Sequence, residues 1–71
     1  RYYVHDIIGL AVYTTDGRHI GQVTEVLRGK ANDVYVTPRA MIPAIKQVVR
    51  EIDLAKRKMV IEPTDGLLEG A

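Results

Sequence analysis

The clearest signal of secondary structure in the chain is the octapeptide Leu10-Ala11-Val12-Tyr13-Thr14-Thr15-Asp16-Gly17. Its first six residues suit the pleated surface of a strand, and Asp-Gly is a strong hairpin turn sequence. A second strand should therefore follow over residues 19–28. Within it the apolar positions change parity, because Ile20 falls on one face and Val23 on the other, which indicates a β-bulge or a strand buried on both faces.

Two further runs alternate as strands do. Asp33-Val34-Tyr35-Val36-Thr37 follows a segment of loop composition and ends before Pro38, so we expect three consecutive antiparallel strands from residue 10 onward. Lys58-Met59-Val60-Ile61-Glu62 alternates in the same way and is ended by Pro63.

The segment between these strands, residues 43–56, is ambiguous. Its apolar residues recur at helical spacing, and Pro43 suits the first turn of a helix. Against a helix, Val48, Val49 and Ile52 are β-branched, and the same stretch can be interpreted as a strand in which apolar and polar side chains alternate. Periodicity alone leaves helix and strand equally open.

Length and composition limit the chain to one small domain. With 71 residues it buries only about 60% of the surface that its unfolded chain exposes, which leaves a thin core and no room for a deep active-site cleft. It has no cysteine, so disulfides and thiolate metal sites are excluded, and its longest apolar run is far shorter than the roughly 20 residues that span a bilayer. Ten basic side chains against nine acidic ones give no support to nucleic-acid binding by bulk charge.

No combination of side chains suggests catalysis or metal binding. The nearest is His5 and Asp6 with Asp16 and His19, whose spacing matches no metal-ligand pattern. Asp16 is better explained as a turn former, and Asp6 as the N-cap of a short turn at Ile7-Ile8. Serine and cysteine, the commonest nucleophiles, are missing from the chain. We therefore expect no enzyme, no cofactor and no metal.

Three groups of residues are candidate contact sites. Tyr2 and Tyr3 offer adjacent aromatic rings with polar tips, although composition alone favours one ring packing on the domain and the other covering a linker. Leu67 and Leu68 form an apolar pair suited to core packing or to docking. A basic cluster could meet RNA phosphate, but the acidic residues nearby favour a solvated hairpin tip; the cluster consists of Arg50, Lys56, Arg57 and Lys58.

Several phrases, taken in order, resemble the C-terminal PRC-barrel domain of the RimM family of ribosome maturation factors. The resemblance covers nearly the whole chain. The phrases are Tyr2-Tyr3-Val4-His5-Asp6-Ile7-Ile8-Gly9, Gly17 with Gly21-Gln22-Val23 ahead of Glu25-Val26-Leu27, Ala31-Asn32-Asp33-Val34, Met41-Ile42-Pro43-Ala44, Val49-Arg50-Glu51-Ile52-Asp53-Leu54 and Gly66-Leu67-Leu68. The resemblance implies a mostly β fold, a small antiparallel barrel of about six short strands with short helical turns at its ends. It thereby favours a strand over a helix in the ambiguous middle segment.

The resemblance also implies a function. Residues 1–71 would be the C-terminal domain of a two-domain protein, with a linker ending near Arg1 and an N-terminal β-barrel domain that the chain lacks. The protein would act without catalysis in the bacterial cytoplasm, binding the nineteenth protein of the small ribosomal subunit in the subunit head and assisting late subunit assembly and rRNA processing. Tyr2 and Tyr3 would be the protein-binding residues, which reverses the preference from composition.

Two other functions stay open. One is direct rRNA binding through Arg50 and residues 56–58. The other is a stand-alone PRC barrel used for docking or self-association. The chain also departs from the family at Val4, where an aromatic residue is frequent, and at residues 37–40, where the connection is short, so an extended aromatic patch and a ribosome contact through that loop are not expected.

Overall fold

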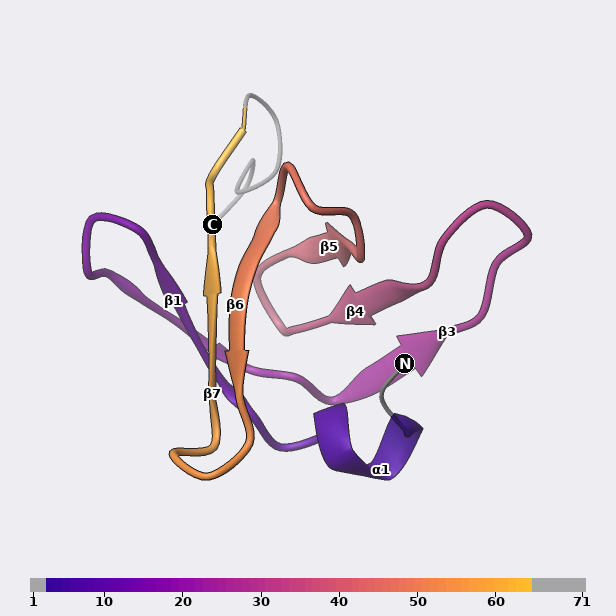
Figure 1. The fold of residues 1–71 in the computed structure, drawn as a ribbon, viewed down its shortest axis with the longest axis horizontal. Coiled ribbons are helices and arrows are strands. Elements are labelled where there is room, and N and C mark those ends of the chain that lie inside the picture. The colour runs from indigo at the N-terminus through magenta and orange to yellow at the C-terminus, as the bar shows by residue number, and fades with distance from the viewer. Residues whose placement is uncertain (1–2, 65–71) are drawn as a thin grey trace.

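The computed structural model describes residues 3–64. Within them it contains one short helix and seven strands (Figure 1). These elements are α1 (Val4–Ile7), β1 (Ala11–Thr14), β2 (His19–Gln22), β3 (Glu25–Leu27), β4 (Val34–Val36), β5 (Met41–Pro43), β6 (Val49–Asp53) and β7 (Lys58–Ile61). The helix has four residues, too few to cross a membrane. The mostly β prediction is confirmed.

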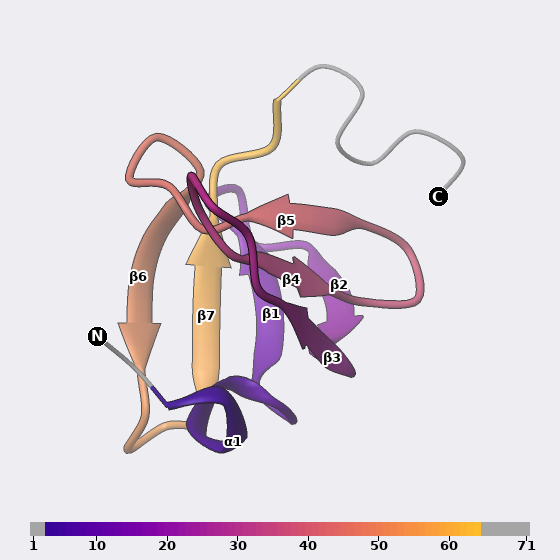
Figure 2. The ribbon, with the colours of Figure 1, turned by 90° about the vertical axis from the view of Figure 1, so that its right-hand side faces the viewer.

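The strands form two sheets that face each other across the core. One has the order β2-β1-β7-β6 and the other the order β3-β4-β5. Figure 2 shows the three-stranded sheet in front of the four-stranded one, with α1 and the β6–β7 turn at the same end of both. Neighbouring strands are antiparallel except β1 and β7, which are parallel because the chain passes through the second sheet before it returns.

The prediction of one strand over residues 19–28 is wrong, because the chain changes sheets within it. Val23 is hydrogen-bonded to the segment before β1, since the Gly9 N–H donates to the Val23 carbonyl (2.8 Å) and the Val23 N–H to that of Leu10 (3.0 Å). The next residue, Thr24, donates its N–H to the Val36 carbonyl in the other sheet (2.8 Å). Three consecutive strands of one sheet are therefore not formed.

The predicted β-bulge is present as well. Val12 pairs with Gly21 and Tyr13 with His19, which leaves Ile20 as the extra residue on β2. The bulge turns Ile20 into the core, where it is 5% exposed. The change of parity in the sequence thus comes from a bulge and a crossing between sheets, a few residues apart.

The middle segment is a strand preceded by a single turn. The Val48 and Val49 N–H groups both donate to the Ile45 carbonyl (3.0 and 2.8 Å), and β6 begins at once. The helical spacing of the apolar residues therefore corresponds to a single turn at residues 45–49. The strand that the family resemblance favours is confirmed. The short β5 had no signal in the sequence, because it has three residues and one is Pro43, which lacks an N–H and fits only at the edge position that β5 occupies.

The core lies between the two sheets and is built by alternate residues of the strands. Its largest fully buried side chains are Ile7, Leu10, Val12, Val23, Ile42, Met59 and Ile61. Because Ile7 belongs to α1, the helix is anchored to one end of this core. That end carries the first candidate contact residue.

Candidate functional site

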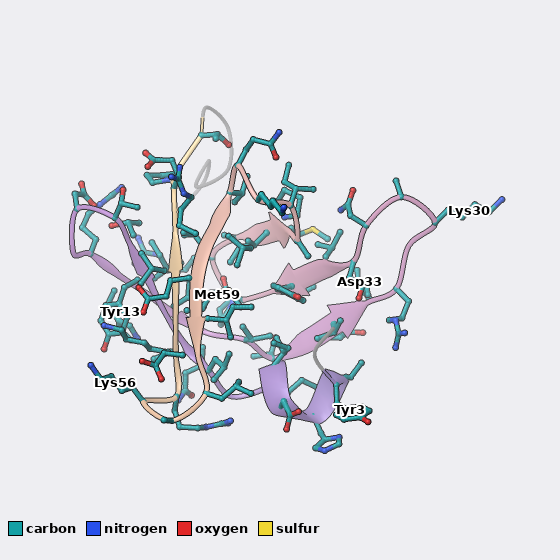
Figure 3. All side chains as sticks on the ribbon, viewed as in Figure 1. Tyr3, Tyr13, Lys30, Asp33, Lys56 and Met59 are labelled. Atoms are coloured by element: carbon teal, nitrogen blue, oxygen red, sulfur yellow. The ribbon has the colours of Figure 1, made fainter. Side chains whose placement is uncertain are left out.

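Tyr3 lies at the N-cap of α1, and this residue is 72% exposed. Its ring stacks on that of His5, with centroids 5.8 Å apart and an angle of 12° between the planes. Figure 3 shows Tyr3 beside α1, on the outside of the domain. The helix thus presents an aromatic surface with a phenol group to the solvent, which is the chemistry of a protein contact. Tyr2, Leu67 and Leu68 lie outside the described residues.

Arg57 lies in the turn between β6 and β7 and reaches across to α1. Its Nη1 donates to the Asp6 carbonyl and its Nη2 to the Ile8 carbonyl, both at 3.2 Å. Its own carbonyl accepts a hydrogen bond from the Ala11 N–H (3.0 Å). Side chain and backbone of this one residue therefore connect the β6–β7 turn with the segment that carries Tyr3.

The other three basic candidates are less engaged. Lys56 is exposed and points outward from the turn (Figure 3), while its backbone N–H donates to the Asp53 carboxylate (3.0 Å). Lys58 is half-buried on β7 opposite Asp53, and Arg50 is exposed on β6 at a register shift. The structure therefore brings three of the four cations to one turn, but it also places a carboxylate there and uses one guanidinium internally.

The set of His5, Asp6, Asp16 and His19 is not brought together. His5 Nε2 is 3.8 Å from Asp6 Oδ1, and His19 packs its ring on Tyr13 instead, with centroids 5.0 Å apart. Among residues 3–64 no group of three or more potential ligands could hold a metal ion. The prediction that Asp6 is an N-cap is wrong, because the helix begins two residues earlier and Tyr3 occupies the cap position without a side-chain bond.

Asp16 is a turn former, as expected. The buried Thr14 hydroxyl donates a hydrogen bond to the Asp16 carboxylate and accepts one from the Arg18 N–H (2.9 Å). The bond from Thr14, with a smaller contribution from the Arg18 charge, lowers the pKa of Asp16 below its usual 3.8. The carboxylate therefore belongs to the hydrogen bonds that stabilise the first hairpin.

Two surfaces were missed by the sequence interpretation. The first is the outer face of the second sheet, which carries Leu27, Val34, Val36, Met41 and Pro43. Its signal was present in residues 33–37, where valines flank Tyr35 and both faces are therefore apolar. The second is an open groove of about 440 Å³ between β6 and the second sheet. No sequence pattern indicated it, because its walls come from separate segments of the chain. The residues that line it are Tyr35, Ala44, Ile45, Lys46, Val49, Arg50, Glu51 and Ile52.

Comparisons with known proteins agree on one family. The model of the PRC-barrel domain matches residues 1–68. The ribosome maturation factor RimM of Limosilactobacillus reuteri (strain DSM 20016) is 46% identical over 72 residues, which cover 94% of this chain and 43% of that protein. RimM of Clostridioides difficile is 42% identical, with 96% and 43% covered.

A solved structure agrees as well. The 16S ribosomal RNA processing protein RimM of Pseudomonas aeruginosa has a TM-score of 0.82 at 29% identity, covering 89% of this chain and 44% of that one. The chain therefore spans less than half the length of the relatives that it matches.

Proposed function

Because the chain belongs to the PRC-barrel family and its relatives are ribosome maturation factors, we propose that it is the PRC-barrel part of a factor for small-subunit assembly. In this role it assists late assembly of the small ribosomal subunit and processing of its rRNA. In this role the protein acts in the bacterial cytoplasm, and the immature small ribosomal subunit is the particle to which it binds.

The contact that we assign to this domain is with the nineteenth protein of the small subunit, in the subunit head. Tyr2 and Tyr3 are the binding residues. The observation that supports this assignment is the position of Tyr3, a residue that is 72% exposed at the start of a helix fixed to the core by Ile7. A rigid aromatic ring with a polar tip gives much contact area and loses little conformational entropy on binding.

The domain acts by binding energy. The proposed contact uses neither a nucleophile nor a metal ion: within residues 3–64 no group of three or more potential ligands could hold a metal, and the threonine hydroxyls that donate to carboxylates, Thr14 to Asp16 and Thr15 to Glu62, lie at the first hairpin. Holding a ribosomal protein in one placement needs neither, since the work consists of restricting how the partner can sit on the maturing subunit.

Direct rRNA contact through Arg50, Lys56, Arg57 and Lys58 receives less support. The Arg57 guanidinium is engaged by two backbone carbonyls, and Asp53 lies at the same turn. Binding of rRNA by these residues would make affinity fall steeply as salt is added. A weak salt dependence of binding to the isolated ribosomal protein, with no shift of rRNA fragments at low salt, is expected.

The test is a titration of the intact protein with the purified ribosomal protein. Replacing Tyr2 and Tyr3 together by alanine should weaken binding by at least about tenfold, the size of effect typical of central aromatic residues. Leu27→Ala is the matched control, because Leu27 is also an exposed apolar residue, at 39%, but lies on the second sheet. Unchanged affinity of the double variant, with a native circular dichroism spectrum in every case, would refute the site.

A further inference from the structure

The helix that carries Tyr3 cannot hold its own orientation. It has four residues, its N-cap makes no side-chain hydrogen bond, and the Ile8 N–H to Val4 carbonyl bond (3.0 Å) closes its one turn. Helices this short do not persist in water without tertiary contacts. What fixes the direction of Tyr3 must therefore come from the rest of the domain.

Two contacts fix the helix from the inside. Ile7 is 1% exposed and packs into the core, and the Gly9 N–H donates to the Val23 carbonyl at 2.8 Å. Both lie at the C-terminal end of the helix and on its buried side. Neither contact engages the carbonyls of Asp6 and Ile8, so a further partner can add to the constraint on the helix there.

Arg57 supplies that constraint. Its two terminal nitrogens bond to two different carbonyls, those of Asp6 and Ile8, which lie on either side of the anchoring Ile7. The guanidinium is planar and rigid, so two bonds from one fork restrict rotation as well as distance. These carbonyls at the helix C-terminus would otherwise have water as their partner.

The backbone on both sides is adapted to this contact. Arg57 has φ 56°, in the left-handed region where glycine or asparagine is usual. Opposite, Gly9 has φ +95°, and a Cβ there would be 3.0 Å from the Arg57 Nη2. A large side chain thus occupies the left-handed position that closes the Leu54–Arg57 turn, and a glycine opposite leaves room for its tip.

The constraint is transmitted to Tyr3 within one turn of backbone. Arg57 holds the Asp6 carbonyl, and the Asp6 N–H donates to the Tyr3 carbonyl at 3.0 Å. We propose that Arg57 is a positioning residue, which orients α1 and so presents the Tyr3 ring to the protein partner. This inference rests on the proposed function, because it concerns the same binding residue, and it assigns to Arg57 a role other than phosphate contact.

Three variants of the intact protein separate positioning from charge. Arg57→Gly removes the guanidinium and suits the left-handed backbone, while Arg57→Lys keeps the charge but replaces the rigid planar fork by a flexible ammonium group, which does not fix the orientation of the two carbonyls as the guanidinium does. Lys56→Ala is the matched control, because Lys56 is the adjacent exposed cation and its side chain makes no polar contact within residues 3–64. Both Arg57 variants should weaken binding of the ribosomal protein by about fivefold, since two exposed hydrogen bonds are lost, and Lys56→Ala by less than twofold.

The decisive measurement is a double-mutant cycle with Tyr3→Ala. If Arg57 acts through Tyr3, Arg57→Gly costs no further affinity in the Tyr3→Ala background. Amide hydrogen exchange at Ile8, whose N–H closes the helix turn, should also accelerate in both Arg57 variants while the β7 amides stay protected. A general structural defect would instead accelerate exchange throughout the sheet.

The outcomes distinguish the two proposals. Loss of binding in Tyr3→Ala together with unchanged binding in Arg57→Gly refutes the positioning role and leaves the proposed site intact. Additive losses in the cycle, or retention of affinity by Arg57→Lys together with accelerated exchange at the Ile8 amide, would mean that Arg57 contacts the partner directly through its charge. Unchanged affinity in Tyr3→Ala refutes the role of Tyr3 in the proposed function and the positioning inference with it.

Discussion

Gly9→Ala tests how closely the Arg57 guanidinium packs against the backbone between α1 and β1. Gly9 has φ +95°, a conformation that costs an alanine about 1–2 kcal/mol relative to glycine. The new Cβ would also lie 3.0 Å from Arg57 Nη2. Because the obstructing atom is the tip of a flexible side chain, the guanidinium should move aside and lose its bonds to the Asp6 and Ile8 carbonyls, at about 0.5–1.5 kcal/mol each.

The free energy of unfolding should therefore fall by about 2–5 kcal/mol in Gly9→Ala. Gly17→Ala is a close control, because Gly17 has φ +92° and a Cβ there meets nothing within 4 Å. It should lose the backbone contribution alone, about 1–2 kcal/mol. For a domain of this size each kcal/mol lowers Tm by about 4–8 °C, so thermal and urea unfolding followed by circular dichroism resolve the two variants.

A third measurement isolates the Arg57 contribution. In an Arg57→Gly background the guanidinium is gone, so Gly9→Ala should cost no more than Gly17→Ala does. If Gly9→Ala is no more destabilising than Gly17→Ala in the otherwise native chain, the two hydrogen bonds of Arg57 carry no measurable free energy. The inference that Arg57 holds α1 in place through these hydrogen bonds would then be refuted.

Two further predictions concern stability. Asp16→Asn should destabilise the protein at neutral pH, because the Thr14 hydroxyl lowers the pKa of Asp16 in the folded state. The stabilisation by the ionised carboxylate is complete above the unfolded pKa of 3.8 and is lost as the pH falls through the folded pKa. In urea titrations the difference in stability between variant and parent should therefore close below pH 3.8. Ile42→Ala should lower the free energy of unfolding, measured in urea, by about 2–5 kcal/mol, because Ile42 is 0% exposed. Ile8→Ala is the control and should lower it by less than about 1 kcal/mol, because Ile8 is 38% exposed. Equal losses of stability in the two variants would contradict the assignment of the core.

The strands that were predicted correctly share a local cause. Residues 10–17 combine β-forming side chains with an Asp-Gly turn, and residues 58–62 alternate strictly, so the signal lies within one element. Hydrogen bonds of the first hairpin join residues four or fewer apart at the turn, as between the Thr14 N–H and the Arg18 carbonyl. Where residues close in sequence are also hydrogen-bonded to one another, the residue pattern alone is sufficient to predict the strand.

The features that were missed depend on contacts between distant segments. The chain crosses between sheets at Val23 because Leu10 and Val36 offer partners on opposite sides, and nothing in residues 19–28 encodes that choice. The parallel pairing of β1 with β7 likewise joins the two ends of the described chain. Periodicity reports which face of a segment is buried, and it carries no information about which strand covers it.

The same distinction applies to the basic cluster, whose members have different surroundings in the structure. In the sequence Lys56, Arg57 and Lys58 are three equivalent cations, but the backbone makes them different. Arg57 alone takes the left-handed conformation, which turns its side chain toward carbonyls 49 and 51 residues earlier in the chain. Its neighbours stay on the hairpin surface. In the proposed positioning role Arg57 would contribute to recognition through geometry, so mutating the cluster as a whole would not separate an electrostatic contact from the orientation of Tyr3. Substitutions at single residues of the turn are therefore needed to tell the two apart.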